Sequence, residues 1–377
     1  MGCRGATIVA PLFSSRRETR LARARKNEFM SGRSAALSHL LVLFLVILAA
    51  YLSTASPVLA ERSVTDMAGR TVRVPDRISR VATIGAVPVL NSFVFALGQS
   101  ATIANNLPPN LGGARWRFQY VVAPDLAKRP VVQSSEGPIV EGVVQASPDV
   151  VLTMDRKTVD LMERVGIPAI FLSWRQPDDV KDVMRLLGEL YQRQDAAEAY
   201  CRYFDDTLAK VSARTEALSL EQRPRVLYAS LDRLTQPHRI AEWWIEKAGG
   251  RSVTDNGRTA EAFNFSIEQV LDWNPEVIFV SAEREIAAAY ANPVLASVSA
   301  IKNRRVYAVP MGVHVWGNRT VEQPLTVLWA AKLIHPDTFG DTALESEVRS
   351  FYENFLGTSL SDEDIREILE GRAGQHR

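Results

Sequence analysis

The sequence predicts an α/β fold of two related lobes with a cleft between them. Three observations support this prediction: short β-rich runs alternate with helical patterns, one sequence unit occurs twice, and a long helical stretch separates its two copies. Such alternation is typical of largely parallel sheets covered by helices. The 377 residues, 46% of them hydrophobic, are enough for two cores, and the composition excludes collagen-like, coiled-coil and mostly disordered chains.

The expected strands are short. Between Ser63 and Pro75, alternating apolar residues flank Ala68-Gly69, a pattern that predicts a β-hairpin. The β-rich runs that follow are Val81–Ile84, Val150–Thr153, Ala169–Leu172, Arg225–Ala229, Glu276–Val280 and Arg305–Val309. Helical patterns intervene, as in Val89–Leu97 and Lys157–Val165.

One unit of sequence occurs twice, at Glu141–Val151 and at Glu268–Ile278. Each copy has a Glu at the start of a short helix, a Pro seven residues later and then a buried strand. The helix dipole favours a Glu near a helix start, and Pro stops the helix before the strand. The two copies therefore predict two similar lobes.

The stretch between the copies is helical. Asp178–Tyr191 predicts one helix, and Asp195 with Glu198 predicts a capping box that opens a second. Continued to about Leu218, the second helix would span roughly 35 Å, enough to cross two lobes. A helix within one domain is the alternative. The expected organisation is an N-terminal lobe at 61–177, linking helices at 178–220 and a C-terminal lobe at 221–377.

The first sixty residues predict a secretory signal peptide. Leu40–Leu52 is an apolar run of 13 residues with basic residues before it, and Val58 and Ala60 suit a cleavage site before Glu61. The run is shorter than the roughly 20 residues that span a membrane, and an uncleaved anchor is the alternative reading. Met30 is an alternative start. We therefore expect an exported, periplasmic protein.

The cysteine content and the charge of the chain further limit the kinds of protein that it can be. The chain has two cysteines, and cleavage would leave only Cys201, which is expected to be buried on the apolar face of the second linking helix, so no intrachain disulfide is expected. The whole chain carries a net charge of +1, but residues 61–377 hold 36 basic and 41 acidic residues. This mildly acidic body argues against nucleic acid as a partner.

Several short motifs follow one another along the chain: Thr65–Pro75 with Arg80-Val81, Gly166–Pro168, Ala248–Gly250, Ala300–Lys302 with Arg305–Tyr307, and Ala331-Lys332 with His335-Pro336. In order and spacing they resemble the substrate-binding proteins of ABC importers for ferric siderophores, haem and vitamin B12, the iron-complex type of periplasmic binding protein. The resemblance runs from Val64 to about Phe339. It implies two Rossmann-like lobes joined by a long rigid helix, with a ligand cleft between them.

The same resemblance implies a partner. In this family one Glu of each lobe docks onto Arg pockets of the permease dimer in the inner membrane, and the matching positions are Glu141 and Glu268, the glutamates of the repeat. The alternative is that both are ordinary residues at helix starts. The protein is expected to act as a monomer that delivers a small molecule to this ABC permease.

Arginines and aromatic residues cluster where loops should follow strands. Such loops form the crevice of α/β sheets, where ligands bind. The predicted ligand-binding residues are Trp116, Arg117, Tyr120, Trp174, Arg175, Tyr228, Arg233, His314, Trp316 and Arg319, with Arg115 beside the first of them. Arg offers forked donors to anionic oxygens and Trp offers flat apolar area. Ordinary surface arginines and core tryptophans are the alternative reading.

These residue types predict an anionic metal chelate as the ligand, with a ferric siderophore as first choice. A molybdate or tungstate oxyanion, a corrinoid and haem are the alternatives within the same fold. No resident cofactor and no bare metal site are expected, because His238, His314, His335 and His376 are well separated. His335 lies in a His-Pro turn of the resembled family and is interpreted as structural.

An enzyme is not expected. The chain has no Gly-x-Ser-x-Gly elbow, no phosphate-binding Gly-rich loop and no His-Glu-x-x-His motif. A chelatase-like enzyme of similar two-lobe architecture is the rival reading. It would need an acid–base histidine in the cleft, for which His314 is the candidate. The predicted export signal argues against that rival.

Overall fold

The computed structural model describes residue 44 and residues 60–374. The chain divides into two units between Ala60 and Glu61, and Glu61–Arg377 forms one of them. Most of the predicted signal peptide, with Val58, lies outside the described residues, as does His376. Within the described part of the chain, no helix is long and apolar enough to cross a membrane.

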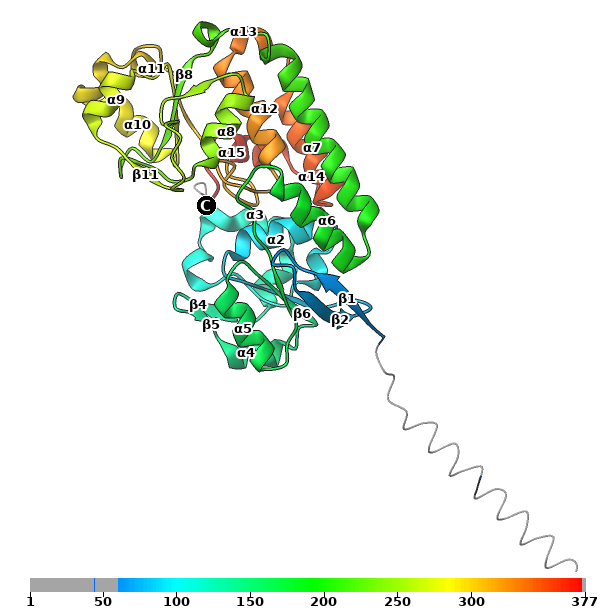
Figure 1. The fold of residues 1–377 in the computed structure, drawn as a ribbon. Helices are drawn as coiled ribbons and strands as arrows, with labels where there is room; N and C mark the ends of the chain where they lie inside the picture. Colours follow the sequence, from blue (N-terminus) through cyan, green and yellow to red (C-terminus); the bar gives the residue numbers. More distant parts are fainter. Residues whose placement is uncertain (1–43, 45–59, 375–377) are drawn as a thin grey trace, which may run out of the picture. The chain divides into compact units, whose positions relative to one another are not determined.

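The N-terminal lobe is a three-layer α/β unit. The predicted hairpin is present as β1 (Glu61–Thr65) and β2 (Thr71–Pro75). The central sheet is parallel, in the order β3 (Val81–Ile84), β6 (Val150–Thr153) and β7 (Ala169–Phe171). One face packs against α2 (Val87–Ala96) and α6 (Asp179–Tyr191), and the other against α4 (Val140–Ala146) and α5 (Arg156–Arg164) (Figure 1).

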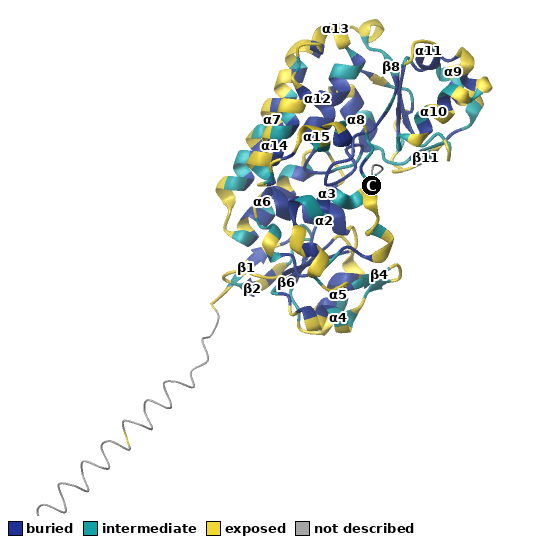
Figure 2. Cartoon of the chain, turned by 180° about the vertical axis from the view of Figure 1, so that it is seen from behind, coloured by how far each residue is buried: buried dark blue, intermediate teal, exposed yellow. Residues whose placement is uncertain are grey.

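The C-terminal lobe repeats this arrangement. Its parallel sheet has the order β10 (Arg251–Ser252), β8 (Arg225–Ala229), β12 (Val277–Val280) and β13 (Val306–Ala308). One face packs against α8 (Ile240–Lys247) and α12 (Gln323–Ile334), and the other against α9 (Ile267–Trp273), α10 (Arg284–Ala291) and α11 (Ser299–Lys302). Figure 2 shows α12 almost wholly buried, whereas α9 is exposed on its outer side. The predicted strands are confirmed to within one or two residues at their ends.

The second linking helix, α7 (Gln194–Thr215), joins the lobes. Its 22 residues span about 33 Å, and it packs against α2 and α6 of the N-terminal lobe and against α8 and α12 of the C-terminal lobe. Cys201 lies on its buried face, as expected. The helix therefore crosses both lobes and shares one core with them.

The predicted capping box at the start of α7 is wrong. The residue before the helix is Arg193, which makes no side-chain capping bond, and Glu198 pairs with Arg185 of α6 at 2.8 Å. The preceding Gln192 has a left-handed backbone (φ 54°), so α6 turns tightly into α7. Because of this turn the helix begins at Gln194, so Asp195 lies inside its first turn and not at the capping position.

Smaller elements complete the lobes. They are α3 (Arg117–Val122), the hairpins β4–β5 (Gln133–Ser134, Gly137–Pro138) and β9–β11 (Thr235–Gln236, Phe263–Asn264), and the C-terminal helices α13 (Pro336–Phe339), α14 (Leu344–Phe355) and α15 (Asp362–Leu369). His335 has the structural role expected of it, since its Nε2 lies 3.0 Å from the carbonyl of Gly249.

The repeated sequence unit forms the same local structure in both lobes. In each copy the short helix ends in a left-handed residue, Ser147 (φ 45°) or Asn274 (φ 41°). An arginine at the start of the neighbouring strand then donates to a carbonyl at that helix end: Arg80 to Ala146 at 3.0 Å and Arg225 to Asn274 at 3.1 Å. The repeat thus fixes how each helix turns into its strand.

Candidate ligand cleft

Loops that follow the strands of both sheets enclose a cleft of about 690 Å³. Ala86, Met154 and Trp174 line it from the N-terminal lobe, just after β3, β6 and β7. His238 and His314 line it from the C-terminal lobe. Because the carboxyl ends of parallel strands meet at one edge of a sheet, this is the position in which α/β proteins bind ligands.

A smaller pocket of about 220 Å³, here called the side pocket, adjoins the cleft and shares Pro237, His238 and Asn318 with it. It lies at the carboxyl ends of β8 and β12. Besides His238 and Asn318, its polar lining consists of the side chains of Arg115, Tyr228, Ser230, Arg233, Thr235, Ser281, Arg284 and Glu285. Guanidinium and hydroxyl groups therefore dominate this pocket.

The N-terminal wall of the cleft combines a tryptophan with an arginine. Trp174 is 6% exposed and packs edge-to-face on Phe93, with ring centroids 5.1 Å apart. The next residue, Arg175, is exposed, and the carboxylate of Asp179 fixes its backbone N–H at 2.6 Å. Trp174 is therefore rigid, while the Arg175 side chain is available to a ligand.

Arg319 ties the two lobes together across the cleft. Its guanidinium donates to both carboxylate oxygens of Glu261, at 3.1 and 3.0 Å, and its Nε donates to the carbonyl of Arg175 at 2.9 Å. Desolvation tends to raise the pKa of Glu261, but the bond and charge of Arg319 outweigh it and lower that pKa. Arg319 therefore lines the cleft as one half of an ion pair.

The histidines of the cleft contribute no positive charge near neutral pH. Burial lowers the pKa of His314 to about 4 and lowers that of His238 as well. Trp116 packs on the His314 ring, with centroids 5.4 Å apart, and so connects the N-terminal lobe to this part of the C-terminal lobe. Arginines are therefore the cations of the cleft.

In the side pocket, Arg115 and Arg233 are exposed at its rim, and Tyr228 is buried inside it. Desolvation lowers the pKa of Arg115, and the neighbouring charge of Arg284 acts in the same direction. Burial raises the pKa of Tyr228 to about 12, so its hydroxyl stays protonated. Asn318 carries a buried side-chain oxygen with no hydrogen-bond partner in the described part of the chain.

The structure thus brings seven of the ten predicted ligand-binding residues to the cleft or its margin. Trp174, Arg175, His314 and Arg319 line the cleft, Tyr228 and Arg233 line the side pocket, and Trp116 packs against His314. Three predicted residues lie elsewhere.

Arg117 is paired away from the cleft. It forms a bidentate ion pair with Glu367 of α15, with Nε at 2.9 and 3.0 Å from the two oxygens, and it also pairs with Asp364. These bonds hold its pKa above the ordinary value. Prediction of Arg117 as a ligand contact is therefore not supported.

Tyr120 and Trp316 are also corrected. The Tyr120 hydroxyl donates to Asn106 at 2.9 Å, and its side chain packs on the core. Trp316 is fully buried; its backbone N–H donates to the carbonyl of Pro310 at 3.1 Å, and its carbonyl accepts from the Thr326 hydroxyl of α12 at 2.9 Å. Neither residue lines the cleft.

Other cleft residues were not predicted from the sequence. They are Arg239, Glu261, Arg284 and Asn318, together with His238, which the sequence presents only as an isolated histidine. Arg239 stands at the start of α8, and its buried Nε has no partner among the described residues. One feature of the sequence could have indicated His238 and Arg239 as cleft residues: they stand just before the helix that follows the first strand of the lobe.

Glu141 and Glu268 lie in corresponding places in the two lobes. Each is exposed in the first turn of its helix, α4 or α9. Hydrogen bonding by Ser266 lowers the pKa of Glu268. Both carboxylates therefore face solvent, and neither lines the cleft.

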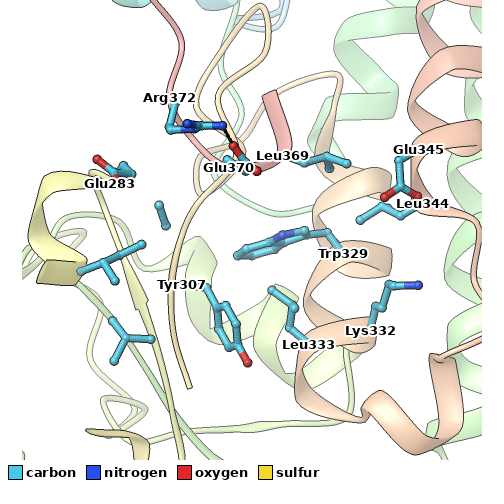
Figure 3. Close-up of a pocket in the computed structure, with 13 residues that line it drawn as sticks. Glu283, Tyr307, Trp329, Lys332, Leu333, Leu344, Glu345, Leu369, Glu370 and Arg372 are labelled. Atoms are coloured by element: carbon cyan, nitrogen blue, oxygen red, sulfur yellow. Dashed lines mark ion pairs between the residues drawn. The ribbon is translucent and has the colours of Figure 1, made fainter. Parts of the chain in front are cut away.

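A separate hollow of about 510 Å³ lies along the outer edge of β13 (Figure 3). Trp329, Tyr307 and Leu369 form its apolar lining, and Glu283 and Glu345 lie on opposite sides of it. It shares no lining residue with the cleft. Among the described residues, no group of three or more His, Cys, Asp or Glu side chains could hold a metal ion, in this hollow or elsewhere.

Comparisons with known proteins agree with this geometry. The molybdate-binding protein MolA of Haemophilus influenzae is 25% identical over 337 residues, which cover 81% of this chain and 94% of that protein. A cobalamin-binding protein of Halobacterium salinarum is 27% identical over 203 residues, 52% of this chain and 53% of its own.

Among solved structures, a periplasmic solute binding protein from Veillonella parvula has a TM-score of 0.74 and 26% identity, covering 84% of this chain and 99% of that one. A family model described as periplasmic binding protein matches residues 114–311, more than half of the chain. With the two-lobe fold and the cleft, this match shows that the chain belongs to the periplasmic binding protein family.

Proposed function

We propose that this protein is the exported substrate-binding component of an ABC importer and that it captures an anionic small molecule in the cleft. One observation carries the proposal. Six arginines but only two glutamates line the cleft and the side pocket, and four of those arginines form no ion pair with any described residue: Arg115, Arg175, Arg233 and Arg239. Like charges gathered in this way are costly unless an anion offsets them.

A ferric siderophore is the first candidate ligand. A cleft of about 690 Å³ is within the usual range for an organic ligand, and far larger than one tetrahedral oxyanion needs. Trp174 offers flat apolar area to the organic part of a chelate, and Arg175 and Arg239 offer donors to its anionic oxygens.

A bare oxyanion such as molybdate is the second candidate, and the side pocket favours it. That pocket is about 220 Å³ and is lined by three guanidinium groups and several hydroxyls. Such small, donor-rich surroundings suit a compact anion. The likeness to a molybdate-binding relative supports the same candidate.

Delivery to the permease is assigned to the two exposed glutamates. Glu141 and Glu268 occupy equivalent positions in two lobes of the same topology, which suits a two-fold symmetric permease dimer. We propose that the signal segment directs the protein to the periplasm and that a monomer docks. No resident cofactor and no catalytic turnover belong to this function.

Isothermal titration calorimetry with two probes tests the ligand class. The probes are a ferric tris-catecholate complex and sodium molybdate, each titrated into wild type, Arg175→Ala and Arg233→Ala. A chelate should lose affinity mainly with Arg175→Ala, and molybdate mainly with Arg233→Ala. Arg214→Ala is the control, because that residue pairs with Asp341 at 2.9 Å on the surface, outside the cleft lining.

The following results distinguish an anion receptor from a corrinoid receptor and from a chelatase-like enzyme. If wild type binds either probe and a cleft variant binds it more weakly, the result supports an anion receptor. If neither anion binds wild type but a neutral corrinoid does, the anion proposal fails. Appearance of a metal-inserted product from a porphyrin and a metal ion would instead favour the chelatase-like alternative.

A further inference from the structure

A buried carboxyl group lies directly beneath the cleft. Glu322 precedes α12 and is completely buried. One of its oxygens accepts a hydrogen bond from the Tyr352 hydroxyl at 2.6 Å, and the other accepts one from the His314 backbone N–H at 3.0 Å. No cation of the described chain forms an ion pair with it. Burying a carboxyl without a cation is costly, so its retention needs a reason.

The surroundings are shaped to fit this group. A Cβ atom at Gly312 would lie 1.9 Å from the Glu322 oxygen and 2.3 Å from the Tyr352 hydroxyl, so a side chain at that position cannot be accommodated. Glu322 also stands at the N-terminus of α12, where the helix dipole favours negative charge. The loop, the helix and Tyr352 of α14 therefore converge on this carboxyl.

The hydrogen bonds continue into the N-terminal lobe. The Val313 N–H donates to the Tyr352 hydroxyl at 3.0 Å, and the Val313 carbonyl accepts from the Gln119 side chain at 2.7 Å. Gln119 in turn accepts from Asn91 at 2.9 Å, and Asn91 accepts from Thr83 of β3 at 2.8 Å. Every residue of this chain of bonds is fully buried, so it links one sheet to the loop of the other lobe.

The segment held by these bonds is the one that presents His314 to the cleft. Gly312–Trp316 has Val313 fixed from two sides and the His314 N–H fixed by Glu322. The His314 side chain lines the cleft and packs on Trp116. Without an acceptor at position 322, the buried N–H of His314 would lose its partner, which normally costs enough to move a loop.

We propose, on the basis of the function proposed above, that Glu322 is a positioning residue of the cleft: with Tyr352 and Gln119 it holds Gly312–Trp316 and keeps His314 against the ligand. An amide at position 322 replaces it only in part. Gln offers one oxygen, which can keep the bond from the His314 N–H, but its NH₂ group would then face the Tyr352 hydroxyl, which would have to accept and would lose the acceptor for its own O–H.

Hydrogen exchange of the ligand-free protein, followed by mass spectrometry, tests this role without any assumption about the ligand. Glu322→Gln and Tyr352→Phe should each raise amide exchange at least tenfold in peptides covering 311–320, with little change in peptides covering β6. Met162→Ala is the matched control, because it opens the separate core on the α4 and α5 side of the N-terminal sheet and lowers stability without touching the network.

Affinity measurements then connect the loop to the ligand. For whichever probe binds wild type, molybdate or the ferric tris-catecholate, Glu322→Gln should weaken binding about tenfold and Met162→Ala should leave it unchanged. Unchanged exchange at 311–320 in both Glu322→Gln and Tyr352→Phe would overturn the positioning role. Failure of both probes to bind wild type would instead count against the proposed function, because the exchange result does not depend on them.

Discussion

The two lobes have the same scaffold but different interiors at the cleft. The order β3-β6-β7 in one sheet matches β8-β12-β13 in the other, which has β10 as an additional edge strand, and in both lobes an arginine, Arg80 or Arg225, binds the end of the repeated helix. Beyond the strand ends they differ. The N-terminal lobe presents a rigid wall of Trp174 and Arg175, whereas the C-terminal lobe is hollowed by the side pocket. A duplicated fold thus preserves strands and helix ends, while the loops carry the chemistry.

The buried polar groups differ in the same way. To the hydrogen-bonded network that joins the lobes, the N-terminal lobe contributes neutral side chains, Thr83, Asn91 and Gln119, while its buried Asp66 lies outside this network and pairs with Arg70. The C-terminal lobe uses ionisable ones, Glu322 and Tyr352. Neutral amides hold their geometry at any pH, but a buried carboxyl does not. The two lobes should therefore respond differently to pH, to ligand and to mutation.

The largest expected effect concerns the surface that the lobes share. Glu141→Ala combined with Glu268→Ala should abolish ligand uptake in cells, because both carboxylates are proposed to dock on the permease, and charge pairs at such contacts govern recognition. Affinity for the ligand should stay unchanged, because neither residue lines the cleft. Uptake of labelled ligand and calorimetry on the purified variant measure the two effects.

The single variants Glu141→Ala and Glu268→Ala show how much each lobe contributes to docking. Helix α9 has a Ser266–Gln269 capping box, whereas α4 has no side-chain cap, so Glu268 stands on the better fixed helix. Each single variant should retain part of the uptake that the double variant loses. Normal uptake by the double variant would eliminate the docking role.

Between about pH 4.5 and 7, a pH effect on stability is expected from Glu322 of the C-terminal lobe, whereas the buried Asp66 of the N-terminal lobe, whose pKa is lowered, titrates below this window. Burial raises the pKa of Glu322 to about 7 from an ordinary value of 4.5, opposed by bonds from Tyr352 and the loop. Between about pH 4.5 and 7 the unfolded chain releases this proton before the folded chain does. The free energy of unfolding should therefore fall as pH rises through that window, by up to about 3 kcal/mol from this group.

Other groups face Glu322 and must be considered. Tyr352 of α14 contacts it, Tyr200 of α7 donates to the neighbouring Val321 carbonyl at 2.9 Å, and His314 lies in its own loop. Burial holds the pKa of both tyrosines well above 10 and that of His314 near 4, so none of them titrates between pH 5 and 7. Urea unfolding at pH 5 and pH 8 should show a smaller pH difference for Glu322→Gln than for wild type. Equal differences would contradict the assignment.

A smaller effect compares the two sides of the cleft. Loss of one charge-assisted contact costs roughly 1.5–3 kcal/mol, about ten- to a hundredfold in affinity. If the proposed function holds, Arg175→Ala should remove such a contact from the N-terminal wall, and Arg233→Ala should remove one from the side pocket. Calorimetry with whichever of the two probes, molybdate or the ferric tris-catecholate, binds wild type shows which side contributes more to affinity. Arg117→Ala should leave affinity within about twofold of the Arg214→Ala control, and a larger loss would restore its predicted contact with the ligand.

Much of this organisation could be predicted from the sequence, because strands, helices and the repeat are local patterns. The positions of the strands and of α7 follow from apolar spacing, but the sequence leaves open whether α7 crosses both lobes or lies within one. The ion pair of Arg117 could not be predicted in this way, because its partner Glu367 lies 250 residues further along the chain. A sequence shows that Arg and Trp share a loop, but not which of them faces solvent, a ligand or the core.

Trp316 and Glu322 show the same limit. Trp316 follows a strand and shares a loop with Arg319, yet it is buried in the core, and its backbone N–H bonds to Pro310. Glu322 belongs to no motif, and its partner Tyr352 is 30 residues away. The bonds of Arg117 with Glu367 and of Tyr352 with Glu322 join residues far apart in the sequence, whereas strands and helices follow short-range patterns.

The smallest expected effect tests the repeat itself. Ser147 and Asn274 both have left-handed backbones at the ends of the repeated helices. This conformation costs an ordinary residue about 1–2 kcal/mol, less for Asn and nothing for Gly. Ser147→Gly should therefore raise the free energy of unfolding by about 0.5 kcal/mol, because relief of strain exceeds the entropy that Gly adds to the unfolded chain.

Asn274→Gly should act in the opposite direction, although the backbone angles at the two positions are nearly equal. The Asn274 side chain accepts a hydrogen bond from the Ser299 N–H at 2.8 Å, and Gly would leave that donor without a partner. The expected loss is about 1 kcal/mol. Urea unfolding of the two variants measures both signs. If both substitutions stabilise the protein equally, the helix ends of the two lobes are energetically equivalent and the Asn274–Ser299 bond contributes nothing.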